Sequence, residues 1–146
     1  MTRVILVFLF ISSIYSAQGN TENLIQVVSR GNDNIYIDTS GLDNFSGEDI
    51  FIWAVAEHSV PITIESIEKN ISKTKTYYLF NKRLNKYSIL FLIYYDDIGN
   101  VLASYDYNRN TNIEVYQYNY PIWENSTEYA ILNKCIEIID SKNQKE

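Results

Sequence analysis

Residues 87–105, with the sequence YSILFLIYYDDIGNVLASY, decide the fold of this chain. The apolar run from Ile89 to Tyr95 is rich in β-branched and aromatic residues, which favours a buried strand over a buried helix. The connection DDIGN (Asp96–Asn100) follows, and Gly99 can adopt the positive φ that a tight hairpin loop needs. A second β-rich run begins at Val101. The segment therefore predicts an antiparallel hairpin within a sheet.

Other β-rich runs are closed by Gly, Asn or Asp in the same way. They occupy residues 23–29, 35–38, 49–58, 73–81 and 112–119. Residues 49–58, with the sequence DIFIWAVAEH, carry apolar side chains at both odd and even positions. Alternate residues of a strand point to opposite faces, so this run is predicted to be an interior strand that is apolar on both faces.

The last segment of the chain changes from the period of a strand to that of a helix. Asn125 can cap the helix, with Glu128 three residues later as the reciprocal half of a capping box. At helical spacing, one side of this helix carries Tyr129, Leu132, Cys135, Ile136 and Ile139. The sequence therefore predicts an α+β fold, with a single antiparallel, meander-like sheet of about six strands and one C-terminal helix packed on a face.

Residues 1–19 have the layout of a removable export signal. Arg3 precedes an unbroken apolar run from Val4 to Ile11, and Ala17-Gln18-Gly19 fits the small-x-small rule for cleavage. The run is too short to span a bilayer, and nothing later in the chain is predicted to do so. The alternatives are a buried strand and an uncleaved anchor. We expect a signal peptide at residues 1–19, one domain at residues 20–146, and a location in the periplasm, at the cell surface or outside the cell.

Basic residues are concentrated in one stretch of an acidic chain whose formal net charge is −6. This balance argues against nucleic acid as a partner. No acidic residue follows Glu68 before the end of the basic stretch at Lys86. The stretch could dock an acidic protein partner, and its candidate contact residues are Lys73, Lys75, Lys82, Arg83 and Lys86. The alternative is two solvated strand faces joined by a turn.

Tyrosine is the most unusual feature of the composition, since eleven of the thirteen tyrosines lie between Tyr77 and Tyr129. Residues two apart on a strand share one face. A surface of rings with polar tips suits a protein interface, and its candidate members are Tyr105, Tyr107, Tyr116 and Tyr118. A partly wet sheet face under loops is an equal alternative, and a carbohydrate platform is a third. The protein partner could also be a second copy of the chain, in a homodimer.

Residues suited to catalysis are scarce. His58 is the only histidine and Cys135 the only cysteine, so a zinc site of several imidazoles cannot be built. Cys135 falls on the apolar side of the predicted helix, where burial raises the pKa of a thiol and makes it inert. Asp96 and Asp97 are adjacent carboxylates, but their hairpin position makes them turn formers. We predict a non-enzymatic protein with no catalytic residue, metal site or cofactor.

The order of the segments resembles the surface-adhesin protein E-like domain family of Gram-negative bacteria. The segments that carry the resemblance are IYIDTSGL (35–42), IFIWAVAEHS (50–59), YSILFLIYYDDIGNVLASY (87–105) and YNYPIWENSTEYAILNKCIEI (118–138). The resemblance implies an exported binding module for protein partners, such as the host extracellular-matrix proteins vitronectin and laminin. The alternative is a periplasmic structural or immunity protein that binds and inhibits another protein.

The resemblance also implies that Cys135 has lost a partner. In the family, the cysteine near the end of the terminal helix bridges to a cysteine on the strand before the long hairpin, and Asn81 stands at that position here. We therefore expect Cys135 to be unpaired and Asn81 to lie within bridging distance of it, so that Asn81→Cys would restore the disulfide. The family's lipid-anchor cysteine is absent as well, which favours the periplasm or the outside of the cell over the outer membrane.

Overall fold

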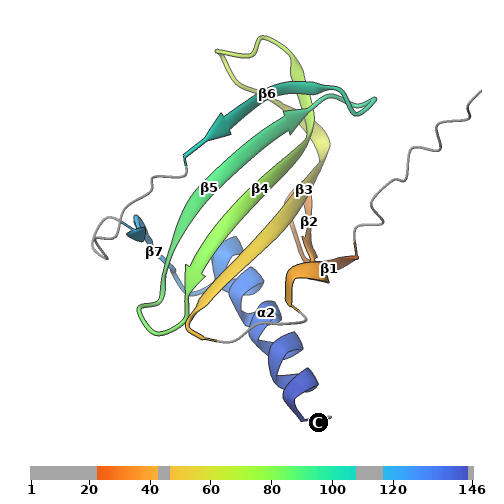
Figure 1. The fold of residues 1–146 in the computed structure, drawn as a ribbon. Helices are drawn as coiled ribbons and strands as arrows, with labels where there is room; N and C mark the ends of the chain where they lie inside the picture. The colour runs from red at the N-terminus through yellow and green to blue at the C-terminus, as the bar shows by residue number, and fades with distance from the viewer. Residues whose placement is uncertain (1–22, 43–46, 108–116, 145–146) are drawn as a thin grey trace, which may run out of the picture.

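The computed structural model describes residues 23–42, 47–107 and 117–144, which form one antiparallel sheet and one α-helix (Figure 1). The elements in chain order are β1 (Leu24–Arg30), β2 (Asp33–Asp38), the 3-10 helix η1 (Thr39–Leu42), β3 (Asp49–Thr63), β4 (Asn70–Asn81), β5 (Lys86–Tyr95), β6 (Val101–Asp106), β7 (Tyr120–Pro121) and α2 (Thr127–Asn143). The predicted signal peptide at residues 1–19 lies outside the described residues.

The strands follow one another in the sheet in chain order from β1 to β6, so the predicted antiparallel meander and the α+β fold class are confirmed. β7 pairs with β5 through Lys86–Pro121 and Tyr87–Tyr120. The strand predicted at residues 112–119 falls largely outside the described residues, and Gln117 to Asn119 lie in no strand. The short β7 follows them instead.

The β5–β6 hairpin that the sequence predicts is present, and Asp96 closes its turn. The carboxylate of Asp96 accepts hydrogen bonds from the backbone N–H of Ile98 at 3.1 Å and of Asn100 at 2.7 Å, and from the side-chain amide of Asn100 at 2.8 Å. These bonds stabilise the charged form, so they lower the pKa of Asp96, with the side-chain bond from Asn100 contributing most. Gly99 supplies the positive φ of 88°. Asp96 is a turn former, as predicted.

The pleat gives the sheet two different faces. The helix face packs against α2, which lies behind the sheet in Figure 1. Its buried strand residues are Ile35, Ile37, Ile50, Ile52, Ala54, Tyr78 and Phe80, and they meet Ile131, Leu132, Cys135 and Ile139 of α2. Among the described elements, no helix covers the other side of the sheet, termed the open face (Figure 1), but residues 117–119 lie against one end of it through hydrogen bonds to Ser88, Asp49 and Asn81. Most of the core therefore lies on the α2 side of the sheet, while Val55 and Leu79 are buried on the open face.

The predicted start of α2 is wrong by one residue. Ser126 caps the helix, because its side-chain oxygen accepts a hydrogen bond from the backbone N–H of Tyr129 at 3.0 Å. Asn125 has a φ of 64°, a left-handed conformation that asparagine tolerates better than most residues. The inward side of the helix is as predicted for Leu132, Cys135 and Ile139, whereas Tyr129 is 36 % exposed.

Within the described ranges, no helix has both the length and the apolar character that crossing a membrane requires.

Candidate functional site

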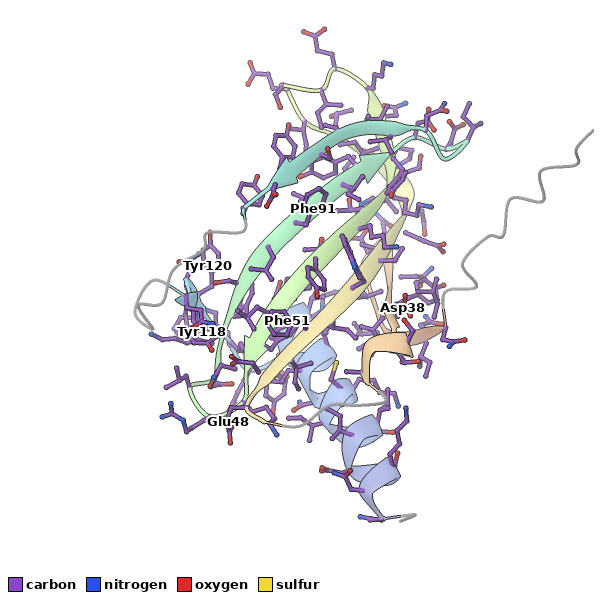
Figure 2. All side chains as sticks on the ribbon, in the orientation of Figure 1. Asp38, Glu48, Phe51, Phe91, Tyr118 and Tyr120 are labelled. Carbon is purple, nitrogen blue, oxygen red and sulfur yellow. The ribbon has the colours of Figure 1, made fainter. Side chains whose placement is uncertain are left out.

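Four aromatic side chains form a continuous row across the open face. Phe51 and Trp53 come from β3, Tyr77 from β4 and Phe91 from β5 (Figure 2). The register explains the row, since Trp53 pairs with Tyr77 and Tyr77 pairs with Phe91. The rings of Trp53 and Tyr77 stack with their centroids 4.8 Å apart. The Phe51–Tyr77 and Trp53–Phe91 centroids are each 6.2 Å apart. These four residues are termed the aromatic row.

The aromatic row is partly exposed to solvent. Phe51 is 45 % exposed, and Trp53, Tyr77 and Phe91 are half-buried. Residues 49–58 were predicted to form an interior strand. β3 is indeed interior in strand order, but α2 covers only one of its faces. Large apolar side chains gathered on an uncovered face are typical of interaction surfaces. The row was not predicted from the sequence, although the aromatic residues at positions 51 and 53 were a signal for it.

Lys73 and Lys75 extend the aromatic row along β4. The ammonium nitrogen of Lys75 lies 5.1 Å from the centroid of the Trp53 ring, and that of Lys73 lies 4.6 Å from the centroid of Tyr95. These distances allow cation–π attraction, which holds both ammonium groups over the open face. A small hollow of about 120 Å³ is lined by these two lysines together with Leu24 of β1, Val55, Glu57 and Tyr95.

The other basic candidates lie elsewhere, so the predicted basic stretch is not one surface. Lys82 and Arg83 belong to the turn between β4 and β5, and Lys86 begins β5. Lys82 follows Lys75 by seven positions of extended chain, which corresponds to roughly 20 Å. The structure therefore divides the stretch into a lysine pair on the open face and a second group at one end of the sheet.

The predicted tyrosine surface divides as well. Tyr105 and Tyr107 share a face as predicted, and their rings stack at a centroid distance of 6.2 Å and an interplanar angle of 12°. They lie on the helix side of the sheet, because paired residues share a face. Tyr105 pairs with Leu92, and Leu92 pairs with Thr76, which shares its face with the core residues Tyr78 and Phe80. The lysine pair and these tyrosines are therefore on opposite faces. Tyr116 lies outside the described residues.

Tyr118 is not a surface contact residue, because it is only 6 % exposed. Its hydroxyl donates a hydrogen bond to Oδ1 of Asp49 at 2.6 Å and accepts one from the side-chain amide of Asn81 at 3.2 Å. These bonds hold the segment before β7 against the ends of β3 and β4 (Figure 2). The role of Tyr118 is thus to anchor the chain at this end of the sheet.

Asn81 does not lie against Cys135 as the resemblance implied. Its side-chain amide also donates to Oδ1 of Asp49 at 2.7 Å. The preceding residue, Phe80, enters the core together with Cys135, and neighbouring strand residues point to opposite faces. A cysteine at position 81 would therefore point away from α2. Cys135 itself is unpaired and buried, and burial raises the pKa of its thiol to about 12, so the thiol is protonated at neutral pH.

A pocket of about 450 Å³ opens beside β5, between the end of β6 and β7. Its lining comes from β5, from the residue that follows β6, and from the segment that leads into β7. The lining residues are Ile89, Leu92, Tyr107, Asn119 and Tyr120. It is termed the tyrosine pocket. Of these five residues only Tyr107 was predicted to be a binding residue. The others carry no local signal, because they come together only through the pairing of β5 with β6 and β7.

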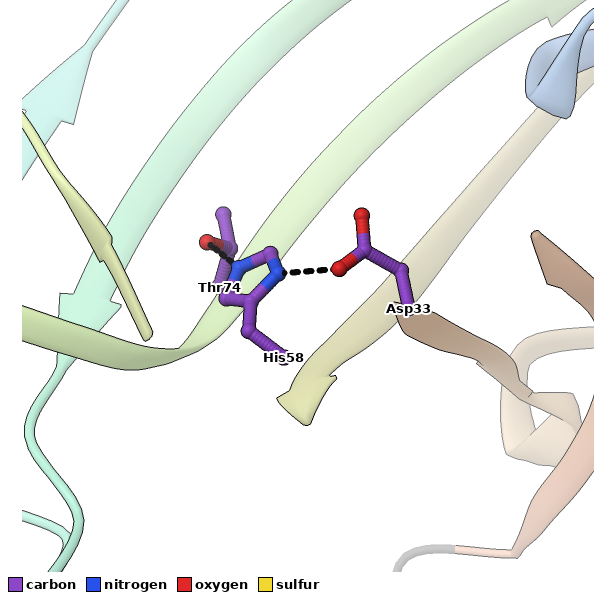
Figure 3. Close-up of polar contacts among 3 residues, drawn as sticks. All are labelled: Asp33, His58 and Thr74. Atoms are coloured by element: carbon purple, nitrogen blue, oxygen red, sulfur yellow. Dashed lines mark hydrogen bonds and ion pairs between the residues drawn. The ribbon is translucent and has the colours of Figure 1, made fainter. Parts of the chain in front are cut away.

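A chain of hydrogen bonds joins β2, β3 and β4 through His58 (Figure 3). Nδ1 of His58 lies 2.8 Å from Oδ1 of Asp33, and Nε2 lies 2.8 Å from Oγ1 of Thr74. A neutral imidazole satisfies both contacts if Nδ1–H donates to the carboxylate and Nε2 accepts the threonine hydroxyl. The side chain of His58 is 6 % exposed, so its two ring nitrogens need partners inside the protein.

The order carboxylate, imidazole, hydroxyl is also that of a catalytic triad. Acyl transfer needs backbone or side-chain donors that stabilise an oxyanion beside the nucleophile. Thr74 lies within β4 and pairs with Ala56 on one side and Tyr94 on the other. The neighbouring backbone N–H groups are therefore engaged in the sheet and do not point at a substrate. The network fits a clasp between three strands better than a reaction centre.

In the described part of the chain, no three His, Cys, Asp or Glu side chains gather where they could hold a metal ion. Comparisons of the chain with protein-family models, with curated proteins and with solved structures found no match. A function is therefore proposed from the surface features of the molecule.

Proposed function

We propose that this protein is an exported, non-enzymatic binding module that holds a protein partner on its open face. The observation that carries the proposal is the aromatic row, in which each ring contacts at least one other ring of the row and remains partly exposed. Removing such rings from water is the main favourable contribution to most protein association. Rings held by their neighbours on a sheet also lose little conformational freedom on binding.

The charges beside the aromatic row suggest the character of the partner. Lys73 and Lys75 place two positive charges at one end of the row, on a chain whose net charge is −6. A partner with an apolar patch and a nearby carboxylate would match both features. Glu57, which pairs with Lys73 across the strands, adds a negative charge that disfavours a uniformly acidic partner. We therefore expect an interface with an apolar centre and one charged edge.

Export and the class of partner rest on the sequence. The signal-like residues 1–19 support export to the periplasm, the cell surface or the medium. The resemblance to the surface-adhesin protein E-like family supports host matrix proteins as partners. A periplasmic structural or immunity protein that inhibits another protein would use the same kind of surface. So would a homodimer with the two open faces packed together.

Surface plasmon resonance on immobilised vitronectin and laminin tests the proposal with the purified protein. Phe51→Ala should weaken binding by more than about 1 kcal/mol, a factor of roughly five, because it removes the most exposed ring of the row. Tyr129→Ala is the matched control, since Tyr129 is an exposed aromatic residue on α2. Equal losses in both variants would contradict an open-face contact. Sedimentation equilibrium measures whether the protein is a homodimer. If the two open faces form that dimer, Phe51→Ala should shift it to the monomer.

A further inference from the structure

The tyrosine pocket has the composition of a small-molecule site. Its volume of about 450 Å³ lies within the range of roughly 300–1,000 Å³ that such sites occupy. None of the residues that line the pocket belongs to the aromatic row, so the two surfaces can be tested separately. We infer that this pocket is a second binding site, and that its ligand is an uncharged sugar ring.

The apolar side chains of the pocket include two tyrosine rings, each of which is held by a neighbouring ring. Ile89 and Leu92 of β5 line it together with two tyrosine rings. Tyr107 and Tyr120 are each 48 % exposed, so their rings are accessible. Each ring is also held by a second tyrosine: Tyr107 stacks on Tyr105, and Tyr120 lies against Tyr87 with centroids 5.3 Å apart. Supported rings of this kind offer fixed faces against which the C–H side of a sugar can pack.

The polar groups of the pocket are placed to bind hydroxyls. The backbone of Asn119 is fixed because its N–H donates to Oγ of Ser88 at 3.0 Å, and that hydroxyl donates to the carbonyl of Gln117 at 2.7 Å. No hydrogen bond among the described residues uses the side-chain amide of Asn119. This amide offers two donors and one acceptor. Tyr107 and Tyr120 also line the pocket, and each carries a hydroxyl that can donate or accept a hydrogen bond.

The described lining residues are uncharged, which favours a neutral ligand. None of the described residues that line the pocket is Lys, Arg, Asp or Glu. A charged ligand would lose water there without gaining an opposite charge, which is unfavourable. A purely apolar ligand would cover the amide of Asn119 and leave it unpaired, which is unfavourable too. A neutral sugar has an apolar C–H face and a hydroxyl edge, so it satisfies both the rings and the amide.

Titration of the isotope-labelled 17.0 kDa protein with neutral sugars, followed by amide NMR, tests the inference directly. The probes are lactose and N,N′-diacetylchitobiose, with N-acetylneuraminic acid as the charged comparison. We expect saturable shifts at the side-chain amide of Asn119 and at the backbone of Ile89 and Leu92. N-acetylneuraminic acid should bind at least tenfold more weakly. Failure of both neutral sugars to saturate, or preferential binding of the charged one, would overturn the inference.

Substitutions then separate stacking from hydrogen bonding. Tyr120→Ala and Asn119→Ala should each weaken sugar binding at least tenfold, whereas Tyr120→Phe, which keeps the ring, should lose less than threefold. Asn119→Ala removes no packed ring, so it keeps the test valid if Tyr120→Ala disturbs β7. Phe51→Ala on the open face should leave sugar affinity unchanged. Sugar binding that survives both alanine variants, or that falls with Phe51→Ala, would place the site elsewhere.

Discussion

His58 joins three strands through two hydrogen bonds, and its removal should show how much a single buried polar side chain contributes to stability. In His58→Ala, Asp33 and Thr74 each lose a partner at a position that is at most partly exposed. We expect the free energy of unfolding to fall by about 1–3 kcal/mol, measured by urea unfolding. Thr74→Val removes only one of the two bonds and keeps the side-chain volume, so it should cost less. A His58→Ala protein as stable as the wild type would contradict the role of a clasp.

Cys135 predicts a specific pH dependence of stability. Burial raises its pKa from 9.0 to about 12. Between these pH values the unfolded chain loses the thiol proton while the folded chain keeps it. The contribution of the protonated thiol to the free energy of unfolding is therefore fully present below pH 9. It falls by about 1.4 kcal/mol per pH unit as the pH rises through this window.

The measurement must isolate the thiol, because burial raises the pKa of Tyr78 as well. The stability difference between the wild type and Cys135→Ala should stay constant from pH 7 to 8.5 and shrink at higher pH, in urea unfolding under reducing conditions. A difference that is unchanged up to pH 11 would show that the thiol is not buried as described.

At the scale of single elements, two substitutions test whether Ser126 caps α2. Ser126→Ala removes the oxygen that accepts the N–H of Tyr129 and should lower the free energy of unfolding by about 1 kcal/mol. Asn125→Gly should be neutral or slightly stabilising, because glycine adopts a positive φ without strain. Thermal unfolding of the two variants distinguishes them. A larger loss of stability in Asn125→Gly than in Ser126→Ala would show that Asn125 caps the helix.

Elements with a strong local signal could be predicted from the sequence, and their neighbours in space could not. The apolar run and the Gly99 turn of the β5–β6 hairpin are encoded within 19 consecutive residues, and the stripe of α2 within one helix. Local sequence does not distinguish Asn125 from Ser126 as the N-cap, since both residue types are good caps. The path of the chain into the helix decides between them. Likewise, β3 is apolar on both faces in the sequence, but only the packed fold reveals that α2 covers one of them.

The candidate sites depended even more on the packed fold. The sequence places Lys73, Lys75 and Lys82 in one basic stretch, but an extended strand carries Lys82 to the far end of the sheet. The tyrosine pocket combines residues of three segments, and only Tyr107 was recognisable from the sequence, because it follows Tyr105 by two residues and shares its face. Tyr118 follows the same alternation but is buried by its bonds to Asp49 and Asn81.

For the whole molecule, the separation of the two basic groups yields a prediction about charge and binding. The positive charges closest to the aromatic row are Lys73 and Lys75, whereas Lys82, Arg83 and Lys86 lie at the end of the sheet. If the open face holds the protein partner, reversing Lys73 and Lys75 to glutamate should weaken binding, mainly by slowing association. Reversing Lys82, Arg83 and Lys86 changes the net charge even more, yet should have a smaller effect because these residues lie outside the contact.

The dependence of binding on salt provides the control for this comparison. Wild-type binding should weaken modestly from 0.05 to 0.5 M NaCl, because salt screens the lysine pair but leaves the burial of the aromatic rings largely unaffected. The Lys73→Glu, Lys75→Glu protein should lose this salt dependence and keep the contribution of the rings. If the triple reversal at 82, 83 and 86 instead abolishes binding, while the double reversal does not, the partner contacts the end of the sheet. The aromatic row would then lie outside the interface, and its exposed rings would need another explanation.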